Sequence, residues 1–100
     1  MNDISVIVPV YNGEKDIEKC LFSLLNQTIN IDIIVIDDGS TDKTRDIVED
    51  LMGKSGERIH YYYKENSGIS DTRNFGVSKI ETEYFGFLDS DDTVAKDMYG

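Results

Sequence analysis

Four short apolar runs, each followed by polar turn residues, constrain the fold of this chain more than any other feature. They cover Ile4–Val10, Ile31–Ile36, Ile59–Tyr63 and Tyr84–Leu88. Runs of this length, rich in β-branched and aromatic residues, predict strands that are covered on both faces by helices. We expect the first strand to end or fray at Pro9, because proline has no N–H to donate to a neighbouring strand.

Segments with helical spacing separate these runs. The first shows its apolar side chains at Ile17, Cys20, Leu21, Leu24 and Leu25. The second shows them at Ile47, Val48, Leu51 and Met52, ends near residues 53–56, and follows Ser40 and Thr41 as candidate N-caps. A third, weaker helix is expected from about Ser70 to Ile80. This alternation predicts an α/β fold, a Rossmann-like parallel sheet of βα units in one domain over residues 1–100.

Charge and cysteine content narrow the function. With 20 acidic and 10 basic residues, the chain has a net charge of −10. This balance disfavours nucleic acid and anionic membrane surfaces as partners, and it suits divalent cations. The single cysteine, Cys20, excludes an intrachain disulfide and a cysteine-based metal site, and we expect a packed thiol. Without an apolar run of about 18 residues or a basic N-terminal region, the sequence predicts a cytoplasmic protein.

Polar residues follow each predicted strand, and parallel strands bring their carboxyl ends to one edge of the sheet. Tyr11-Asn12, Asp37-Asp38, Lys64-Glu65-Asn66 and Asp89-Ser90-Asp91 should therefore lie close together. The crowded carboxylates of Asp89, Asp91 and Asp92 repel one another unless a cation or donor groups of a ligand satisfy them. The sequence predicts a metal-assisted ligand site at this edge.

Taken singly, the residues of this edge leave alternatives open. Tyr11 either caps the core or stacks on a planar base. Asp38 either belongs to a turn or accepts hydrogen bonds from a base N–H or from ribose hydroxyls. Arg73 is either a solvated surface charge or binds a base carbonyl or a phosphate. We assign no role to His60, since a lone histidine in a strand is usually structural.

Four ordered segments of the sequence resemble the family 2 glycosyltransferases with the GT-A fold. They are Ser5–Asn12 (SVIVPVYN), Ile34–Asp42 (IVIDDGSTD), Asn66–Asn74 (NSGISDTRN) and Phe87–Asp92 (FLDSDD). Each segment alone is weakly specific, whereas the ordered set is highly specific. The resemblance implies an enzyme that transfers a sugar from a nucleotide-diphospho-sugar, most commonly a UDP-sugar, to an acceptor hydroxyl, usually with inversion. It also implies a place in cell-surface polysaccharide biosynthesis.

The resemblance also implies roles for individual residues. Pro9, Tyr11, Asp38, Arg73, Asp89 and Ser90 would bind the donor, and Asp91 would be the ligand of Mn²⁺ or Mg²⁺. Within that set, Tyr11 would lie against the base, Asp38 would bond it beside Arg73, and Asp89 would face the ribose.

Asp89 and Asp91 match the D-x-D motif of this family. In this family a carboxylate base deprotonates the acceptor and lies well downstream of that motif, so we expect it beyond Gly100. The chain would then be the nucleotide-binding part of a GT-A domain, truncated before the acceptor half. It would bind a nucleotide with metal but would not transfer sugar alone. The sequence does not identify the acceptor, which would be a glycan, a lipid-linked molecule or a protein. Missing regions would allow peripheral association with the inner face of the membrane.

Other classes remain as alternatives. Asp89-Ser-Asp-Asp-Thr-Val94 also matches the D-x-D-x-T-V motif of haloacid-dehalogenase-type phosphatases, with Asp89 as nucleophile and Asp91 as acid/base. That motif closes the first strand of its family, whereas here it follows the fourth predicted strand. A receiver-like signalling domain would place its acidic pair after the first strand, and here the pair follows the second. A non-catalytic nucleotide-binding module would look the same as the enzyme in this sequence.

Overall fold

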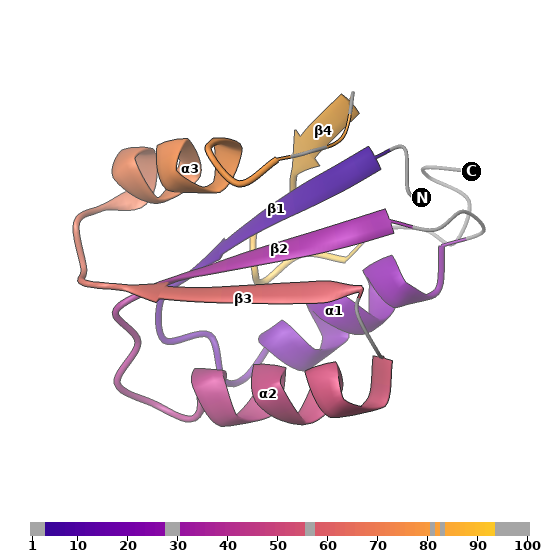
Figure 1. Cartoon of the computed structure of the whole chain (residues 1–100). Coiled ribbons are helices and arrows are strands. Elements are labelled where there is room, and N and C mark those ends of the chain that lie inside the picture. The colour runs from indigo at the N-terminus through magenta and orange to yellow at the C-terminus, as the bar shows by residue number, and fades with distance from the viewer. Residues whose placement is uncertain (1–3, 28–30, 56–57, 81, 83, 94–100) are drawn as a thin grey trace.

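A parallel sheet with helices on both faces forms the molecule (Figure 1). The computed structural model describes residues 4–27, 31–55, 58–80, 82 and 84–93. The elements are β1 (Ile4–Val10), α1 (Ile17–Leu25), β2 (Ile31–Asp38), α2 (Thr44–Ser55), β3 (Ile59–Lys64), α3 (Ile69–Val77) and β4 (Tyr84–Phe87). Strands and helices alternate throughout, so the predicted α/β fold of βα units is confirmed.

The strand order is β3-β2-β1-β4, and every pair of neighbours is parallel. In Figure 1, α1 and α2 cover one face of the sheet and α3 covers the other. The chain order reverses at β1, which has β2 on one side and β4 on the other. A crevice at such a switch point is the usual ligand site of an open α/β sheet.

Each face of the sheet has its own apolar cluster. Val6, Val8 and Val35 pack with α1 and α2, whereas Ile7 and Ile36 form the cluster on the opposite face with Ile34. This division follows from the period of two in a strand, which sends successive side chains to opposite faces. Burial of these side chains is the main force that holds the three layers together.

The prediction that the run Tyr84–Leu88 is a strand covered on both faces is wrong. The side chains of Tyr84, Phe85 and Phe87 are 62%, 48% and 42% exposed. β4 is an edge strand of four residues that pairs only with Ile4–Ile7 of β1. Among the described residues, the helices pack mainly on β1, β2 and β3, which leaves the aromatic side chains of β4 largely in solvent.

The expected end of the first strand at Pro9 is also wrong. β1 continues to Val10, whose partner on β2 is Asp37. The carbonyl of Ile7 faces β4 and accepts a hydrogen bond from the Leu88 N–H at 3.0 Å, so the nitrogen of Pro9, two residues later, faces the same side. Pairing with β4 ends at Ile7, and the missing N–H of Pro9 therefore interrupts no bond between strands.

The predicted start of the second helix needs a further correction. Ser40 and Thr41 do not cap α2, which begins at Thr44. Instead, Oδ1 of Asp42 accepts hydrogen bonds from the backbone N–H of Thr44 at 2.9 Å and from its hydroxyl at 2.5 Å.

Within the described part of the chain, no helix is both long enough and apolar enough to cross a membrane.

Candidate functional site

A cavity of about 650 Å³ opens at the carboxyl ends of the strands. It is lined by residues at the carboxyl ends of β1 and β2, by the segments that follow β1 and β4, and by the segment that leads into the first turn of α3. The predicted donor and metal residues found in its lining are Pro9, Tyr11, Asp38, Asp89, Ser90 and Asp91. The predicted convergence of these distant segments is therefore present. The cavity lies beside the switch point between β1 and β4, where a ligand is expected.

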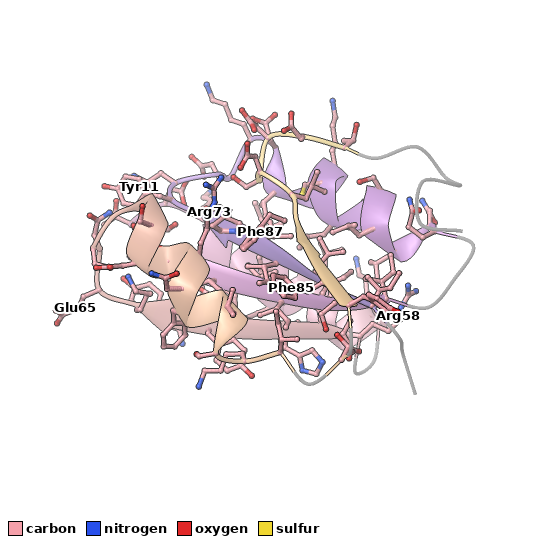
Figure 2. The ribbon with its side chains drawn as sticks, turned by 90° about the horizontal axis from the view of Figure 1, so that it is seen from above. Tyr11, Arg58, Glu65, Arg73, Phe85 and Phe87 are labelled. Atoms are coloured by element: carbon pink, nitrogen blue, oxygen red, sulfur yellow. The ribbon has the colours of Figure 1, made fainter. Side chains whose placement is uncertain are left out.

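Tyr11 and Arg73 lie at the same end of the molecule, and Arg58 lies at the opposite end (Figure 2). The ring of Tyr11 is 54% exposed, so it does not cap the core and one alternative for this residue is removed. Arg73 does not line the cavity, but its Nη2 lies 3.5 Å from Oδ1 of Asp89. Its guanidinium carbon also lies 5.6 Å from the centre of the Phe87 ring, which keeps this charge beside the carboxylates.

The loops after β1 and β2 hold each other through reciprocal hydrogen bonds. The Asn12 N–H donates to Oγ of Ser40 at 2.8 Å, and the Thr41 N–H donates back to Oδ1 of Asn12 at 2.8 Å. The Gly13 N–H adds a bond to Oγ1 of Thr44 at 2.9 Å. Asn12 has a φ of 50°, a left-handed conformation that asparagine tolerates better than most residues. These bonds fix the spacing of the loops that carry Tyr11 and Asp38.

Asp37 and Asp38 have different roles although they are adjacent. Asp37 is fully buried, and its carboxylate accepts bonds from the Ser40 N–H at 2.8 Å and the Tyr61 hydroxyl at 2.5 Å. Burial, and after it the hydrogen bond to Asp37, raises the pKa of Tyr61 above its ordinary value, so the hydroxyl stays protonated as a donor. Asp37 therefore holds the turn after β2, and Asp38 faces the cavity.

Asp38 is the centre of a network with the segment after β3. Its Oδ1 lies 2.8 Å from Nζ of Lys64 and 2.8 Å from the Ser67 nitrogen, and its Oδ2 lies 3.1 Å from the Gly68 nitrogen. Burial alone would raise the pKa of Asp38, but the hydrogen bonds from Lys64, Ser67 and Gly68 outweigh it and lower the pKa below its ordinary value. At neutral pH, Asp38 is an ionised acceptor.

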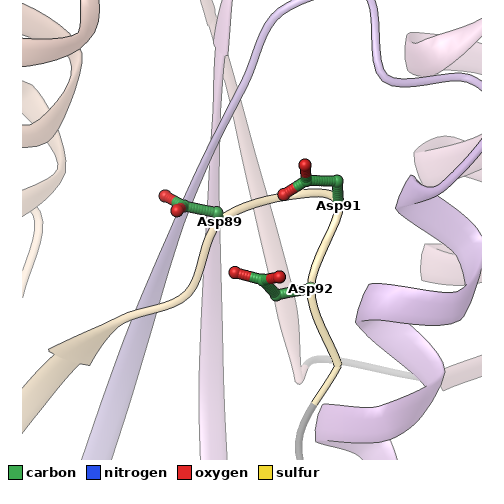
Figure 3. A group of neighbouring side chains, drawn as sticks. All are labelled: Asp89, Asp91 and Asp92. Carbon is green, nitrogen blue, oxygen red and sulfur yellow. The ribbon is translucent and has the colours of Figure 1, made fainter.

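The turn after β4 presents three carboxylates (Figure 3). One ligand oxygen from each of Asp89, Asp91 and Asp92 can be chosen so that all three lie within 4.8 Å of one another, and all three residues are exposed. A backbone bond from the Asp92 N–H to the Asp89 carbonyl at 3.0 Å closes the turn. Carboxylate oxygens are the ligands that Mg²⁺ and Mn²⁺ prefer, and such ions keep several further positions for water and phosphate. This donor set therefore fits a divalent cation.

Cys20 lies beneath this turn. Its thiol donates to the Asp89 carbonyl over 3.7 Å, and the side chain is fully buried. Burial, and after it the charges of Asp92, Asp91 and Asp89, raises the pKa of the Cys20 thiol to about 12. The thiol thus stays protonated and packed, as the sequence predicted.

The cavity lining also includes residues that were assigned no donor or metal role from the sequence: Val10, Asn12, Gly13, Asp16, Asn66, Gly68 and Thr72. Thr72 is fully buried, and its hydroxyl donates to the Gly68 carbonyl at 2.8 Å, which ties the start of α3 to the cavity wall. In the sequence, only its position next to Arg73, a predicted donor-binding residue, indicated that Thr72 could lie at the site. Asp16 lies just before α1, and sequence spacing alone does not show that this position reaches the cavity.

Sequence and structure comparisons agree on the family. A family model described as glycosyl transferase family 2 matches residues 5–100. Glycosyltransferase GlyA of Streptococcus pneumoniae is 44% identical over 95 residues, which are 94% of this chain and 14% of GlyA. The fold is that of a GT-A glycosyltransferase domain. The chain belongs to glycosyl transferase family 2.

Solved structures give the same fold. S. aureus TarS in complex with UDP superimposes with a TM-score of 0.88 at 36% identity, over 99% of this chain and 30% of the TarS chain. The mannosyltransferase PcManGT of Pyrobaculum calidifontis, in complex with GDP-Man and Mn²⁺, has a TM-score of 0.86 at 24% identity, over 91% of this chain and 28% of that one. The present chain thus spans less than a third of either neighbour.

Proposed function

We propose that this chain binds the nucleotide part of a nucleotide-diphospho-sugar, with UDP as the nucleotide, for transfer of the sugar to an acceptor hydroxyl. The observation that carries the proposal is the cavity itself. It combines an exposed tyrosine ring, an ionised aspartate and a carboxylate turn at the switch point of the sheet. The UDP complex of TarS, which shares this fold at 36% identity, supports UDP as the nucleotide.

In this proposal, the two sides of the cavity divide the recognition of the donor. Tyr11 stacks on the base, Pro9 of β1 adds a further donor contact, and Asp38 accepts a hydrogen bond from a base N–H or a ribose hydroxyl. Arg73 keeps a positive charge beside Asp89 and reaches toward the base or a phosphate. In a chain of net charge −10, such local positive charge is what an anionic ligand requires.

The carboxylate turn would hold a divalent cation, Mn²⁺ or Mg²⁺. Asp91 is the proposed ligand, Asp89 faces the ribose, and Ser90 lies between them in the cavity wall. When bound, the cation neutralises the diphosphate oxygens and makes the diphosphate a better leaving group. Asp92 supplies a third carboxylate within reach of the same position.

The remaining parts of the reaction would come from residues outside these 100. We propose that the catalytic base and the acceptor site lie there, which agrees with the small share of TarS that this chain covers. The chain alone would then bind nucleotide with metal without transferring sugar. Family membership favours this function over the phosphatase and receiver alternatives.

Calorimetric titration of UDP into the chain, with Mn²⁺ and then with EDTA, tests the proposal. Asp91→Ala is expected to weaken metal-dependent UDP binding by at least about tenfold, which corresponds to about 1.4 kcal/mol. Asp50→Ala is the matched control, since this carboxylate lies on α2 and pairs with Lys54. Absence of UDP binding by the folded wild-type chain, or equal binding by Asp91→Ala, would contradict the proposal.

A further inference from the structure

The hydrogen bonds of Asp38 leave a defined part of its carboxylate for a ligand. Oδ1 already accepts from two donors, Lys64 and the Ser67 backbone, whereas within the described part of the chain Oδ2 accepts from the Gly68 backbone alone. An ionised carboxylate offers about two acceptor positions on each oxygen. Oδ2 therefore retains one position, and Asp38 lines the cavity.

Lys64 is fully engaged at this point. Its ammonium donates to Oδ1 of Asp38 at 2.8 Å, to the carbonyl of Glu65 at 2.8 Å and to Oγ of Ser67. Its side chain is only 16% exposed, and that of Asp38 is 8% exposed. An ammonium has three donors, so none is left for a phosphate. Lys64 is therefore organised to act on Asp38 rather than on a ligand directly.

Lys64 is also the positive charge that balances Asp38. The other charged side chains that line the cavity are carboxylates, Asp16 after β1 and Asp89 and Asp91 after β4. Neighbouring carboxylates favour the protonated form of Asp38, whereas a paired ammonium favours the ionised form. Arg73 is placed beside Asp89 instead. Among the described residues, Lys64 is the cation that forms an ion pair with Asp38, at 2.8 Å from Nζ to Oδ1.

We propose that Lys64 is a positioning residue for nucleotide recognition. It holds Asp38 as an ionised acceptor and fixes it against the loop before α3, so that one acceptor position of Oδ2 remains for a donor group of the nucleotide. This inference rests on the proposed function and adds to it a residue that touches no part of the donor. A purely structural role for Lys64, in which it only orders the loop through Glu65 and Ser67, is the competing explanation.

A double-mutant cycle separates the two explanations. Lys64→Met keeps the length of the side chain and removes its charge and donors. We expect it to weaken Mn²⁺-dependent UDP binding by about tenfold or more in the wild-type background, because Asp38 loses a charge-assisted hydrogen bond. In the Asp38→Asn background, the same change should alter UDP affinity by less than about twofold. Lys64→Arg, which keeps the positive charge, should restore most of the binding.

Lys54→Met is the matched control, since Lys54 pairs with Asp50 on the exposed side of α2. We expect this variant to bind UDP as the wild type does. An equal loss of affinity on Lys64→Met in both backgrounds, or no loss in either, would overturn the positioning role. Circular dichroism of each variant checks that it is folded.

A second measurement needs no ligand. Carbon-detected NMR titration of the Asp38 carboxyl group is expected to show a higher pKa in Lys64→Met than in the wild type, and little change in Lys64→Arg. An unchanged titration in Lys64→Met would overturn the inference whatever the nucleotide data show. If the wild type binds no UDP, the proposed function fails, and the titration alone then decides whether Lys64 controls the ionisation of Asp38.

Discussion

Asp42 shows how one carboxylate can serve two neighbouring elements. It caps the start of α2 through Thr44, and its Oδ2 accepts a bond from the Glu14 N–H at 3.2 Å. Burial by itself would raise the pKa of Asp42, but the hydrogen bonds from the Thr44 hydroxyl and backbone outweigh it and lower the pKa below 3.8. The ionised form is therefore the one that stabilises the fold.

Asp42→Ala is expected to lower the free energy of unfolding by about 1 kcal/mol at pH 7, the usual contribution of a helix cap. Because the pKa of Asp42 is lowered on folding, the ionised carboxylate stabilises the fold fully above its ordinary value of 3.8. That stabilisation is lost as the pH falls through the lower folded value. Urea unfolding at several pH values measures this, and a difference between variant and wild type that persists unchanged at pH 2 would contradict it.

At the scale of elements, α3 depends on a close approach to the sheet. A Cβ built on Gly76 would lie 2.6 Å from Cγ2 of Ile7 on β1 and 3.3 Å from Cγ1 of Ile36 on β2. Both neighbours are buried and cannot move freely. The absence of a side chain at Gly76 therefore sets the distance at which α3 packs, and α3 begins at the wall of the cavity.

Gly76→Ala is expected to lower the free energy of unfolding by about 1–3 kcal/mol, because the added methyl group overpacks the contact with Ile7. Gly53→Ala is the matched control, since Gly53 lies in α2 and a Cβ there meets nothing within 4 Å. The control should be neutral or stabilising by up to about 1 kcal/mol, owing to the better helix propensity of alanine. Equal effects of the two substitutions in chemical denaturation would argue against this account.

Elements with a clear period were predicted well, and features set by long-range contacts were not. The stripe from Ile17 to Leu25 gave the bounds of α1, which is Ile17–Leu25 in the structure. β2 runs on to Asp38, two residues past the predicted end, because pairing with Tyr63 and Lys64 of β3 outweighs the low strand propensity of aspartate. The same local pattern that predicted a covered strand at Tyr84–Leu88 could not show that β4 lies at the edge.

For the candidate site too, features that follow from local sequence patterns were predicted, and features that depend on long-range contacts were not. Strand ends that converge on one edge are a consequence of topology, and the sequence predicted them. The separate roles of Asp37 and Asp38 depend on Tyr61, which is 24 positions away from Asp37, and on Lys64, which is 26 positions away from Asp38. No local sequence pattern indicates contacts over such distances in the chain.

At the scale of the whole molecule, the chain exposes the aromatic side chains of an edge strand. Tyr84, Phe85 and Phe87 lie on β4, whose second edge has no partner strand in the described sheet. An exposed edge with large apolar side chains favours association between molecules. We expect the sedimentation coefficient of the isolated chain to rise with protein concentration.

Phe85→Lys is expected to weaken this association, since charge on an edge strand opposes pairing. The protein concentration at which association begins should rise by at least about threefold. Phe22→Lys serves as the control, because Phe22 is similarly exposed at 45% but lies on α1. If the chain stays monomeric at all concentrations, or if both variants behave alike in sedimentation velocity, β4 is not the contact.

The pairing of β1 with β4 determines the order in which the sheet and the walls of the cavity can form during synthesis. Ile4 is paired with Tyr84, so one side of the central strand waits for a segment that the ribosome adds 80 residues later. Contacts so distant in sequence slow folding, because a long loop must close before they form. The acidic turn follows directly on β4, and it is therefore the last wall of the cavity to be synthesised. The nascent chain can assemble its first three βα units before the turn that we propose as the cation and diphosphate site exists.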